Sequence, residues 1–332
     1  MRVGVIGAGA NGSNHTRGLT KIEDVEVVGI TDPVAEKANI LAAEVGAKAY
    51  MDHNVMLHEA EPDAVWVSSP GWLHAQHTID CAQAGAHIMC EKPMALSLED
   101  CDHMIDAAKT NNVKLMIGQS TRYSRAYAEL KHILDSSRCG DLVYAWSIRT
   151  NYHRTDPDKL WRLDGEKSGG VVLEWEVHEI DFVCSLGGRV SQVYAQIAYS
   201  REEAPTFMDH FSAVLTFENR GYASLEASQS RTLGMTSRGF VGTKGTAIPE
   251  GRDAVRLRTV DMERAEIIKV TPDQASARGL PKITEDADFI RAIREDDKSP
   301  IPGEDGRANV EIGLAIMESG KTGQVVKLPL SI

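Results

Sequence analysis

The sequence predicts an α/β protein with two domains, a doubly wound parallel sheet followed by an α+β domain with a large, mostly antiparallel open sheet. In residues 1–120, short apolar segments alternate with helical ones, which is typical of parallel strands joined by helical crossovers. In residues 121–332, most apolar segments follow one another without a helix between them, which indicates antiparallel strands. A length of 332 residues also suits two domains better than one.

The composition narrows the range of partners. The formal net charge is -12 and no Lys/Arg-rich run occurs, so we expect neither nucleic acid nor an anionic membrane surface as a partner. Five cysteines without a CxxC pair are typical of reduced thiols in a cytoplasmic protein. No apolar run approaches the length of a membrane span, and no secretory signal pattern opens the chain. We therefore expect a soluble cytoplasmic protein that acts on a small molecule.

A glycine-rich segment lies between the first predicted strand and the first predicted helix. Residues 2–6 form a short apolar strand, the sequence Gly7-Ala8-Gly9-Ala10-Asn11-Gly12 follows at once, and a helix is expected over 13–20. A second strand over 25–31 ends at Asp32, twenty residues after the last of these glycines. A GxGxxG pattern alone is weak, but a preceding strand, a following helix and a distant acidic residue together indicate a dinucleotide site.

The chemistry of dinucleotide binding explains each position of this segment. Gly7 makes the tight turn, Gly9 lets the pyrophosphate approach the backbone, and Gly12 packs helix against strand. The amides at the helix N-terminus favour the diphosphate. Asp32 can accept hydrogen bonds from the ribose hydroxyls and would repel a 2′-phosphate, which favours NAD over NADP. The sequence thus predicts a Rossmann NAD-binding domain, whose diphosphate loop comprises Gly7, Gly9, Ala10, Asn11 and Gly12.

The alternation of strands and helices continues to about residue 120. Helices are expected over 33–45 and from about 97 to 111, and three further strands precede candidate loops. Because parallel strands end at one edge of a sheet, these loops should open beside the first glycine loop. His74 could face the cofactor cleft or only cap its helix. The candidate cofactor residues in these loops are Ser69, Pro70, His74, Glu91, Lys92 and Gln119.

Lys92 follows the apolar strand 86–90 and should face the crevice at the carboxyl ends of the strands. Pro93 fixes how the chain leaves the strand, and a Lys-Pro bond can also be cis. The alternative is a surface lysine on an ordinary strand-to-helix turn.

The second domain begins with an amphipathic helix over 121–135 that carries Arg122 and Tyr123 at its start. A glycine at the turn 218–221 indicates a hairpin. The remaining expected elements are strands at 142–151, 190–199, 210–217 and 222–228, a second hairpin at 240–248, and helices at about 285–296 and 306–320. The last two helices are placed where they could pack back on the first domain.

A polar stripe marks the segment after Gly169-Gly170, which we expect to be one helix through about residue 186. At helical spacing, Glu174, His178 and Asp181 share one face. A carboxylate that holds an imidazole is a common arrangement for a general base. The alternative is a buried histidine with exposed acids. The spacing lacks the second histidine of an HExxH zinc site, and no metal site is expected.

Together these motifs resemble the Gfo/Idh/MocA oxidoreductase family, which includes inositol dehydrogenases and glucose–fructose oxidoreductases. The resemblance implies an N-terminal Rossmann domain at 1–120, and a substrate-binding and oligomerisation domain at 121–332 that forms homodimers or homotetramers through its sheet. It covers nearly the whole chain through six motifs: Gly7-x-Gly9-x-x-Gly12, Ser69-Pro70-x-x-x-His74, Glu91-Lys92-Pro93, Ser168-Gly169-Gly170, Glu174-x-x-x-His178-x-x-Asp181 and Glu318-Ser319-Gly320-x-x-Gly323.

The resemblance also assigns roles to individual residues. Lys92 matches the lysine that contacts substrate and cofactor, His178 the acid/base, and Asp181 the acidic residue one turn later. The family commonly has aspartate where this chain has Glu174, and often a third glycine where it has Val171. The longer side chain of Glu174 could still hold substrate, or could signal a different substrate position or reaction.

The expected function is NAD-dependent hydride transfer from a secondary alcohol of a sugar, sugar derivative or cyclitol. His178 would take the hydroxyl proton and Lys92 would polarise the oxygen. One alternative is a redox-neutral epimerase, lyase or glycosidase that uses NAD transiently, and another is a non-catalytic NAD or sugar sensor. For further candidate substrate residues a packing role is the alternative: Arg122, Tyr123, Tyr152, His153, Trp161 and Arg162.

Overall fold

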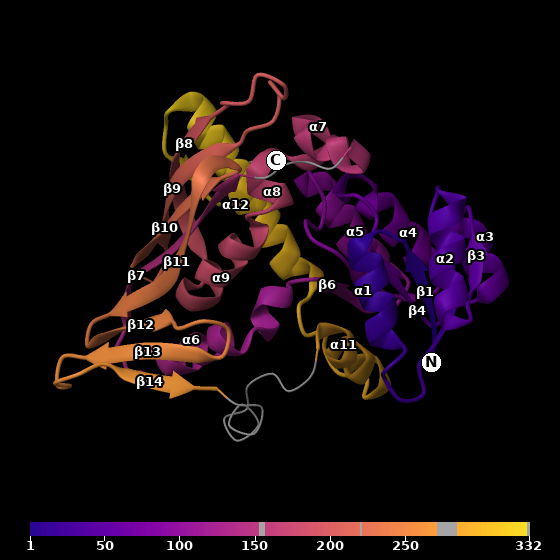
Figure 1. Cartoon of the computed structure of the whole chain (residues 1–332), viewed down its shortest axis with the longest axis horizontal. Helices are drawn as coiled ribbons and strands as arrows, with labels where there is room; N and C mark the ends of the chain where they lie inside the picture. Colours follow the sequence, from indigo (N-terminus) through magenta and orange to yellow (C-terminus); the bar gives the residue numbers. More distant parts are fainter. Residues whose placement is uncertain (153–156, 220, 271–283, 331–332) are drawn as a thin grey trace. The chain divides into compact units, whose positions relative to one another are not determined.

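The computed structural model describes residues 1–152, 157–219, 221–270 and 284–330 (Figure 1). The chain divides into two compact units. The first comprises Met1–Gln119 and Ile283–Val310, and the second Ser120–Lys282 and Glu311–Ile332. The segment from 283 to 310 thus belongs to the first unit although it lies near the end of the chain.

The described residues of the first unit form a six-stranded parallel sheet in the order β3-β2-β1-β4-β5-β6. The order reverses between β1 and β4, so the predicted doubly wound sheet is confirmed. The three-residue β3 was not predicted. The strands are β1 Arg2–Ile6, β2 Glu26–Thr31, β3 Lys48–Tyr50, β4 Ala64–Val67, β5 His87–Cys90 and β6 Leu115–Ile117.

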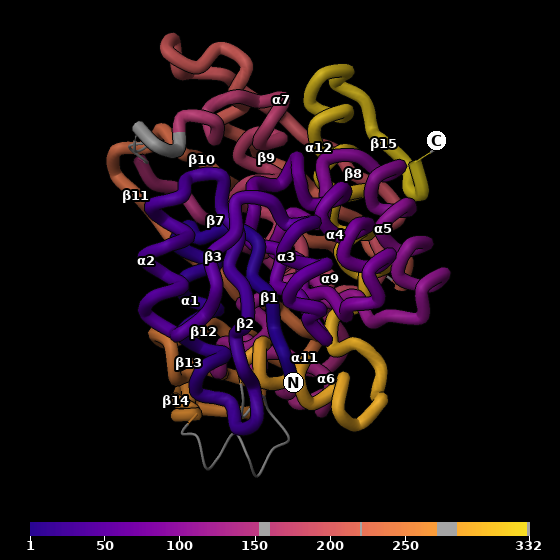
Figure 2. Tube along the Cα trace, turned by 90° about the vertical axis from the view of Figure 1, so that its right-hand side faces the viewer, coloured from indigo at the N-terminus to yellow at the C-terminus, as the bar shows by residue number. Residues whose placement is uncertain are grey.

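Helices connect these strands. In the first unit α1 contacts α2 and α11, whereas α4 contacts α3 and α5. Figure 2 follows the trace from the N-terminus through β1 and α1 into β2, which lies beside β1. The helices are α1 Ala10–Leu19, α2 Ala35–Val45, α3 His53–Ala60, η1 Gly71–Leu73, α4 His74–Gln83, α5 Leu98–Thr110 and α11 Glu285–Arg294.

The carboxyl ends of the parallel strands are aligned. Ile6 pairs in register with Thr31 and with Val67, and Val67 pairs with Cys90, which in turn pairs with Ile117. The residue after each strand therefore lies at the same sheet edge. The prediction that the loops at Gly7, Ser69, Lys92 and Gln119 share this edge is confirmed.

The described residues of the second unit form a nine-stranded sheet in the order β14-β13-β12-β11-β7-β10-β9-β8-β15. The pair β7 and β10 is parallel and the other pairs are antiparallel, which confirms the mostly antiparallel sheet. Its strands are β7 Leu142–Tyr152, β8 Val190–Ala198, β9 His210–Phe217, β10 Tyr222–Ser228, β11 Ser230–Gly242, β12 Gly245–Pro249, β13 Ala254–Thr259, β14 Glu266–Lys269 and β15 Val326–Lys327.

Helices cover one face of this sheet. In Figure 1, α8 and α9 lie against the strands β7 and β10, where Ala223, Leu225 and Ala227 are buried. On alternate positions, Tyr194 and Tyr222 are more than 40% exposed, at 42% and 44%. The helices of this unit are η2 Ser120–Tyr123, α6 Arg125–Asp135, η3 Pro157–Leu163, α7 Gly165–Ser168, α8 Gly170–Glu174, α9 Val177–Gly187 and the second half of α12 Gly303–Thr322.

Two general features bear on the sequence expectations. The five cysteines, which all lie in the described part of the chain, form no disulfide, and four of them are buried. Among the described residues, no helix combines the length and apolar character needed to cross a membrane.

Candidate functional site

The glycine loop after β1 leaves open space at its middle position. A Cβ atom at Gly7 would lie 2.6 Å from the Ser68 carbonyl oxygen, and one at Gly12 would lie 1.8 Å from the Gly7 carbonyl oxygen. Gly7 also has a φ of 99°, which favours glycine. In contrast, a Cβ atom at Gly9 would meet no atom within 4 Å. Gly7 and Gly12 are therefore required by the turn itself, and Gly9 borders space that a ligand can occupy.

Asp32 is fixed beside this loop. Its Oδ2 atom accepts a hydrogen bond from the Ala8 amide at 2.9 Å, and its Oδ1 atom accepts one from the Val34 amide at 2.9 Å. The N-terminus of α1 at Gly9 has no side-chain cap. A carboxylate oxygen accepts more than one hydrogen bond, so Asp32 retains capacity for ribose hydroxyls. These groups fit the ribose and diphosphate of NAD.

His74 ties the loop after β4 to the loop after β5. It is 1% exposed, and its Nδ1 and Nε2 atoms lie 2.7 Å from the carbonyl oxygens of Pro93 and Ser69 respectively. Leu73, not His74, is the N-cap of α4, and there is no side-chain cap hydrogen bond there. His74 therefore does not cap its helix with its side chain, because both ring nitrogens contact the main chain. That it faces the cofactor cleft stays a prediction.

The Ser69 hydroxyl is held by a second histidine. The Ser69 Oγ atom lies 2.9 Å from His77 Nδ1. Burial lowers the pKa of His77 to about 4, and the neighbouring His53 and His74 act in the same direction. The neutral His77 ring can therefore accept the hydroxyl proton of Ser69 and fix its orientation.

Lys92 is half-buried at the end of β5, and the Lys92-Pro93 peptide bond is cis, as the sequence allowed. The Lys92 amide donates to the Oε2 atom of Glu91 at 3.1 Å. The Glu91 Oε1 atom lies 2.9 Å from His15 Nε2. Glu91, a candidate cofactor residue, is thus engaged within the protein through both carboxylate oxygens.

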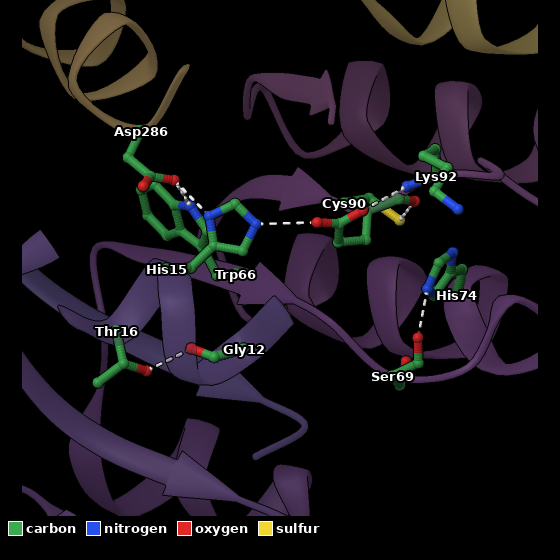
Figure 3. A network of polar contacts seen from close by, with 10 residues as sticks. Gly12, His15, Thr16, Trp66, Ser69, His74, Cys90, Lys92 and Asp286 are labelled. Carbon is green, nitrogen blue, oxygen red and sulfur yellow. Dashed lines mark hydrogen bonds and ion pairs between the residues drawn. The ribbon is translucent and has the colours of Figure 1, made fainter. Parts of the chain in front are cut away.

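His15 belongs to a buried network that the sequence analysis did not find. Its Nδ1 atom lies 2.6 Å from Asp286 Oδ1, and the Trp66 indole donates to the same oxygen at 2.8 Å. Figure 3 shows the His15 ring between Asp286 on one side and the end of β5, with Cys90 and Lys92, on the other. His15 and Asp286 are 271 positions apart, so no local pattern could have paired them.

The predicted single helix over 171–186 is wrong, because it is interrupted between α8 and α9. Glu174 ends α8, and α9 begins at Val177. The Glu176 amide bonds to the Val171 carbonyl, and Arg149 Nη1 donates to the Trp175 carbonyl at 3.0 Å. The Glu179 amide bonds to the Glu176 carbonyl and not to the Trp175 carbonyl, so Glu174 does not share an unbroken helical face with His178.

Two carboxylates of this segment are paired with arginines. Asp181 is 1% exposed, and its two oxygens accept from Arg122 Nε and Nη2 at 2.8 and 2.6 Å. Glu174 is 4% exposed and lies 2.9 Å from Arg162 Nε. The Arg162 guanidinium also lies 5.3 Å from the centre of the Trp161 ring. The structure thus brings together Arg122 with Asp181, and Glu174 with Arg162 and Trp161.

The other candidate substrate residues are more dispersed. Tyr152 is 50% exposed, and its ring centre lies 5.3 Å from the Arg201 guanidinium. Tyr123 is half-buried at the end of η2. His153 lies outside the described residues.

A buried ion pair fixes the start of α9 around the half-buried His178. Glu179 accepts from Arg238 Nε at 2.5 Å and from the Ser147 hydroxyl at 2.7 Å. Burial raises the pKa of Glu179, but hydrogen bonding to Arg238 and Ser147 outweighs it, so the pKa lies below its ordinary value. Glu179 therefore remains charged and anchors the turn that carries His178 to β7 and β11.

Comparison with protein families agrees with this division into units. Residues 1–119 match a model described as an oxidoreductase family with an NAD-binding Rossmann fold. Residues 127–248 match the GFO/IDH/MocA C-terminal domain.

Individual relatives agree with these matches. The chain is 38% identical to inositol 2-dehydrogenase 3 of Saccharopolyspora erythraea over an aligned segment of 133 residues. This segment covers 40% of this chain and 39% of that protein. The match therefore spans less than half of that relative. The chain is 27% identical to the uncharacterized oxidoreductase YrbE of Bacillus subtilis, with 98% and 96% of the two chains covered. Levoglucosan dehydrogenase in complex with NADH and levoglucosan shares the fold, with a TM-score of 0.91, 23% identity, and coverage of 99% and 100%.

Proposed function

Because the chain belongs to the Gfo/Idh/MocA oxidoreductase family and carries its NAD-binding Rossmann domain, we propose that it is a sugar or polyol dehydrogenase. The reaction is hydride transfer between the nicotinamide of NAD and a secondary alcohol of a sugar, sugar derivative or cyclitol. Relatives named inositol 2-dehydrogenase and levoglucosan dehydrogenase support this substrate class. We also propose that the protein acts in the cytoplasm.

One observation carries the proposal. The glycine loop, Asp32 and Lys92 follow strands whose carboxyl ends are in register, so they share one edge of the sheet. The strand order reverses between β1 and β4, and in such sheets ligands bind at that edge. A lysine here is suited to act beside a bound nicotinamide.

Each catalytic group has a separate task in the proposed reaction. Bound NAD supplies the hydride acceptor. His178 takes the proton of the substrate hydroxyl as a general base. Lys92 donates a hydrogen bond to the same oxygen and stabilises negative charge as it develops, which is typically worth about a hundredfold or more in rate.

The substrate side chains lie in the second unit. Trp161 offers an aromatic face to the apolar side of a sugar ring. Arg162 and Glu174 offer donors and acceptors for hydroxyl groups. We also propose roles in substrate binding for Arg122, Asp181, Tyr123, Tyr152 and His153. The cofactor residues of the proposal are Gly7, Gly9, Ala10, Asn11, Gly12, Asp32, Ser69, Pro70, His74, Glu91 and Gln119.

The direct test is a panel of polyols and aldoses with NAD and with NADP, followed by the absorbance of the reduced cofactor. Lys92→Ala should lower kcat about a hundredfold with the best substrate. Lys109→Ala is a matched control, because this lysine is exposed and forms a surface ion pair with the exposed Glu304 of α12. Near wild-type turnover by Lys92→Ala would contradict the assignment.

A redox-neutral epimerase, lyase or glycosidase that uses NAD transiently is the second candidate. The observation that favours it is Glu174, which stands where the family commonly has aspartate. A purified protein that carries NAD and converts a sugar without net formation of NADH would support this candidate over the dehydrogenase. Binding of NAD and sugar without any turnover would instead support a non-catalytic sensor.

We further propose that the second unit forms a homodimer or homotetramer through its sheet. The face away from α8 and α9 carries a stacked pair, Tyr144 and Trp146, whose ring centres lie 5.7 Å apart. Tyr222 lies beside Tyr144, with ring centres 4.8 Å apart. Tyr222→Lys should lower the molar mass measured by light scattering, and an unchanged mass would contradict this interface.

A further inference from the structure

The buried histidine of the first unit lies outside the groups to which the proposed reaction assigns chemistry. His15 is on α1, three residues after Gly12, and is 7% exposed. It contacts Asp286 on α11 through Nδ1 and Glu91 after β5 through Nε2, at 2.6 and 2.9 Å. One ring therefore joins three separate elements (Figure 3).

The partners of this ring determine its protonation. An ionised carboxylate only accepts hydrogen bonds, so both ring nitrogens must donate, and His15 must be an imidazolium. Burial lowers the pKa of His15, but the hydrogen bonds to Asp286 and Glu91 outweigh it and raise the pKa to about 10. The charge on His15 therefore persists across the physiological range.

The surrounding groups are consistent with this charge. The Trp66 indole on β4 donates to Asp286 and fixes its carboxylate. The titratable groups that act on His15 among the described residues are Glu91, Asp286 and Glu285. Burial raises the pKa of Glu285 to about 8, so its carboxyl group is mostly neutral near pH 7 and does not compete for the imidazolium.

Glu91 connects the network to Lys92. One carboxylate oxygen of Glu91 faces His15, and the other accepts the main-chain amide of Lys92 at 3.1 Å. The Glu91 side chain thus contributes to where the backbone of Lys92 is held. A neutral His15 could donate to only one of its two carboxylate partners.

We propose that His15 is a positioning residue for Lys92. Asp286 holds the His15 imidazolium, the imidazolium holds the Glu91 carboxylate, and Glu91 holds the main chain from which the Lys92 side chain extends. This inference rests on the proposed function, because the position of Lys92 affects turnover only if Lys92 acts on substrate. A network that only stabilises the fold is the opposing interpretation.

The test is Asp286→Asn, which keeps the size of the side chain and removes its charge. The His15 pKa falls because one of the two carboxylates that stabilise the imidazolium is lost. Below the new pKa, the variant should turn over at nearly the wild-type rate. Above it, His15 becomes neutral, its contact with Glu91 loses the charge-assisted part of its strength, and kcat should fall at least about tenfold relative to wild type.

The measured quantity is the ratio of wild-type to variant kcat between about pH 6 and about pH 9.5. Titrations that do not depend on Asp286 cancel in this ratio. Asp286 helps to raise the pKa of Glu285 to about 8, so both proteins are compared in a Glu285→Gln background, which removes that titration. We expect the ratio to rise with pH while the Kd for NADH, measured by fluorescence, changes less than about twofold. A ratio that is independent of pH would overturn the proposal, because loss of a structural contact alone has no reason to titrate.

The matched control is Glu44→Gln on α2. It removes a carboxylate from an exposed ion pair with Arg17, which lies on α1 as His15 does. Its kcat ratio should stay near one at every pH. A control ratio that rises with pH as steeply as that of Asp286→Asn would overturn the specific role of the buried network.

A measurement on the unmodified protein does not depend on the folding of any variant. Nitrogen-15 NMR of labelled histidine should show both nitrogens of His15 protonated at about pH 8. A neutral tautomer at that pH would overturn the inference. Failure of the proposed function gives a different pair of results. The His15 spectrum would still show an imidazolium, but no polyol would reduce NAD.

Discussion

Replacing Glu285 by glutamine should make the folded protein less sensitive to alkaline pH. Glu285 is the first residue of α11, and its Oε2 atom is buried without a hydrogen-bond partner. Burial raises its pKa from 4.5 to about 8; Glu91 and Asp286 act in the same direction, and His15 opposes them. The folded state thus keeps a proton that the unfolded chain loses.

The sign and size of the effect follow from proton linkage. Below pH 4.5 the carboxyl group is protonated in both states and costs nothing. Between pH 4.5 and about 8 only the folded state keeps the proton, so the free energy of unfolding falls as pH rises. The difference between these two pKa values is about 3.5 units, which at 1.36 kcal/mol per unit corresponds to a loss of at most ~5 kcal/mol. Glutamine is neutral at every pH and lacks this loss.

The assay is urea unfolding of wild type and Glu285→Gln at about pH 5 and about pH 9. The stability of the variant relative to wild type should increase between these two pH values by up to ~4 kcal/mol, because about three of the 3.5 pH units of the linkage lie above pH 5. The slope from His15, whose raised pKa also lowers stability as pH rises, is present in both proteins and cancels. Glu44→Gln on the surface should show no such gain. Parallel pH profiles for wild type and Glu285→Gln would refute the reasoning.

Three further predictions concern the cofactor loop and the second unit. Asp32→Ala should weaken NAD binding about tenfold to a hundredfold, because charged hydrogen bonds to the ribose are worth about 1.5–3 kcal/mol. It should also reduce the preference for NAD over NADP, and isothermal titration with both cofactors measures the two effects. Gly9→Ala should fold normally but bind NADH more weakly, whereas Gly12→Ala should lower the thermal midpoint, since its Cβ would lie 1.8 Å from a carbonyl oxygen. Arg122→Gln should destabilise the protein by about 3 kcal/mol in urea unfolding, because it leaves the buried Asp181 without its arginine.

The first unit could be predicted largely from sequence because local patterns determine it. The first unit shows three such patterns: the apolar strand over 2–6, the glycine loop and Asp32. Each calls for particular residue types at fixed spacing, so the sequence alone shows it. The three-residue β3 was missed, because so short a segment has no measurable period. The partners of His15 were missed for another reason. They come from α11 and from the end of β5, and no pattern within one segment reports such a contact.

The second unit was predicted less well because long-range side-chain contacts decide its local structure. At the interruption between α8 and α9, Arg149, a residue of β7, donates to the Trp175 carbonyl. Helical spacing alone therefore placed Glu174 and His178 on one face, although the backbone turns between them. The strands β13 and β14 were also missed. β13 alternates between apolar and charged residues, which is a strand signal that the sequence analysis did not use. β14 is only four residues long and does not alternate, so its sequence carries no such signal.

The contacts of Glu174 bear on the choice between the two enzymatic candidates. A buried carboxylate needs a charged partner, and Glu174, at 4% exposed, has Arg162 at 2.9 Å. The same guanidinium lies against Trp161 and Trp175, with 5.3 and 5.8 Å to the ring centres. The pair with Arg162 thus connects Glu174 to η3, which carries Trp161 and Arg162. A change in the position of η3 directly alters where a substrate is held. It alters proton or hydride transfer only indirectly. For that reason Glu174 is better explained by a different substrate within dehydrogenase chemistry than by a different reaction.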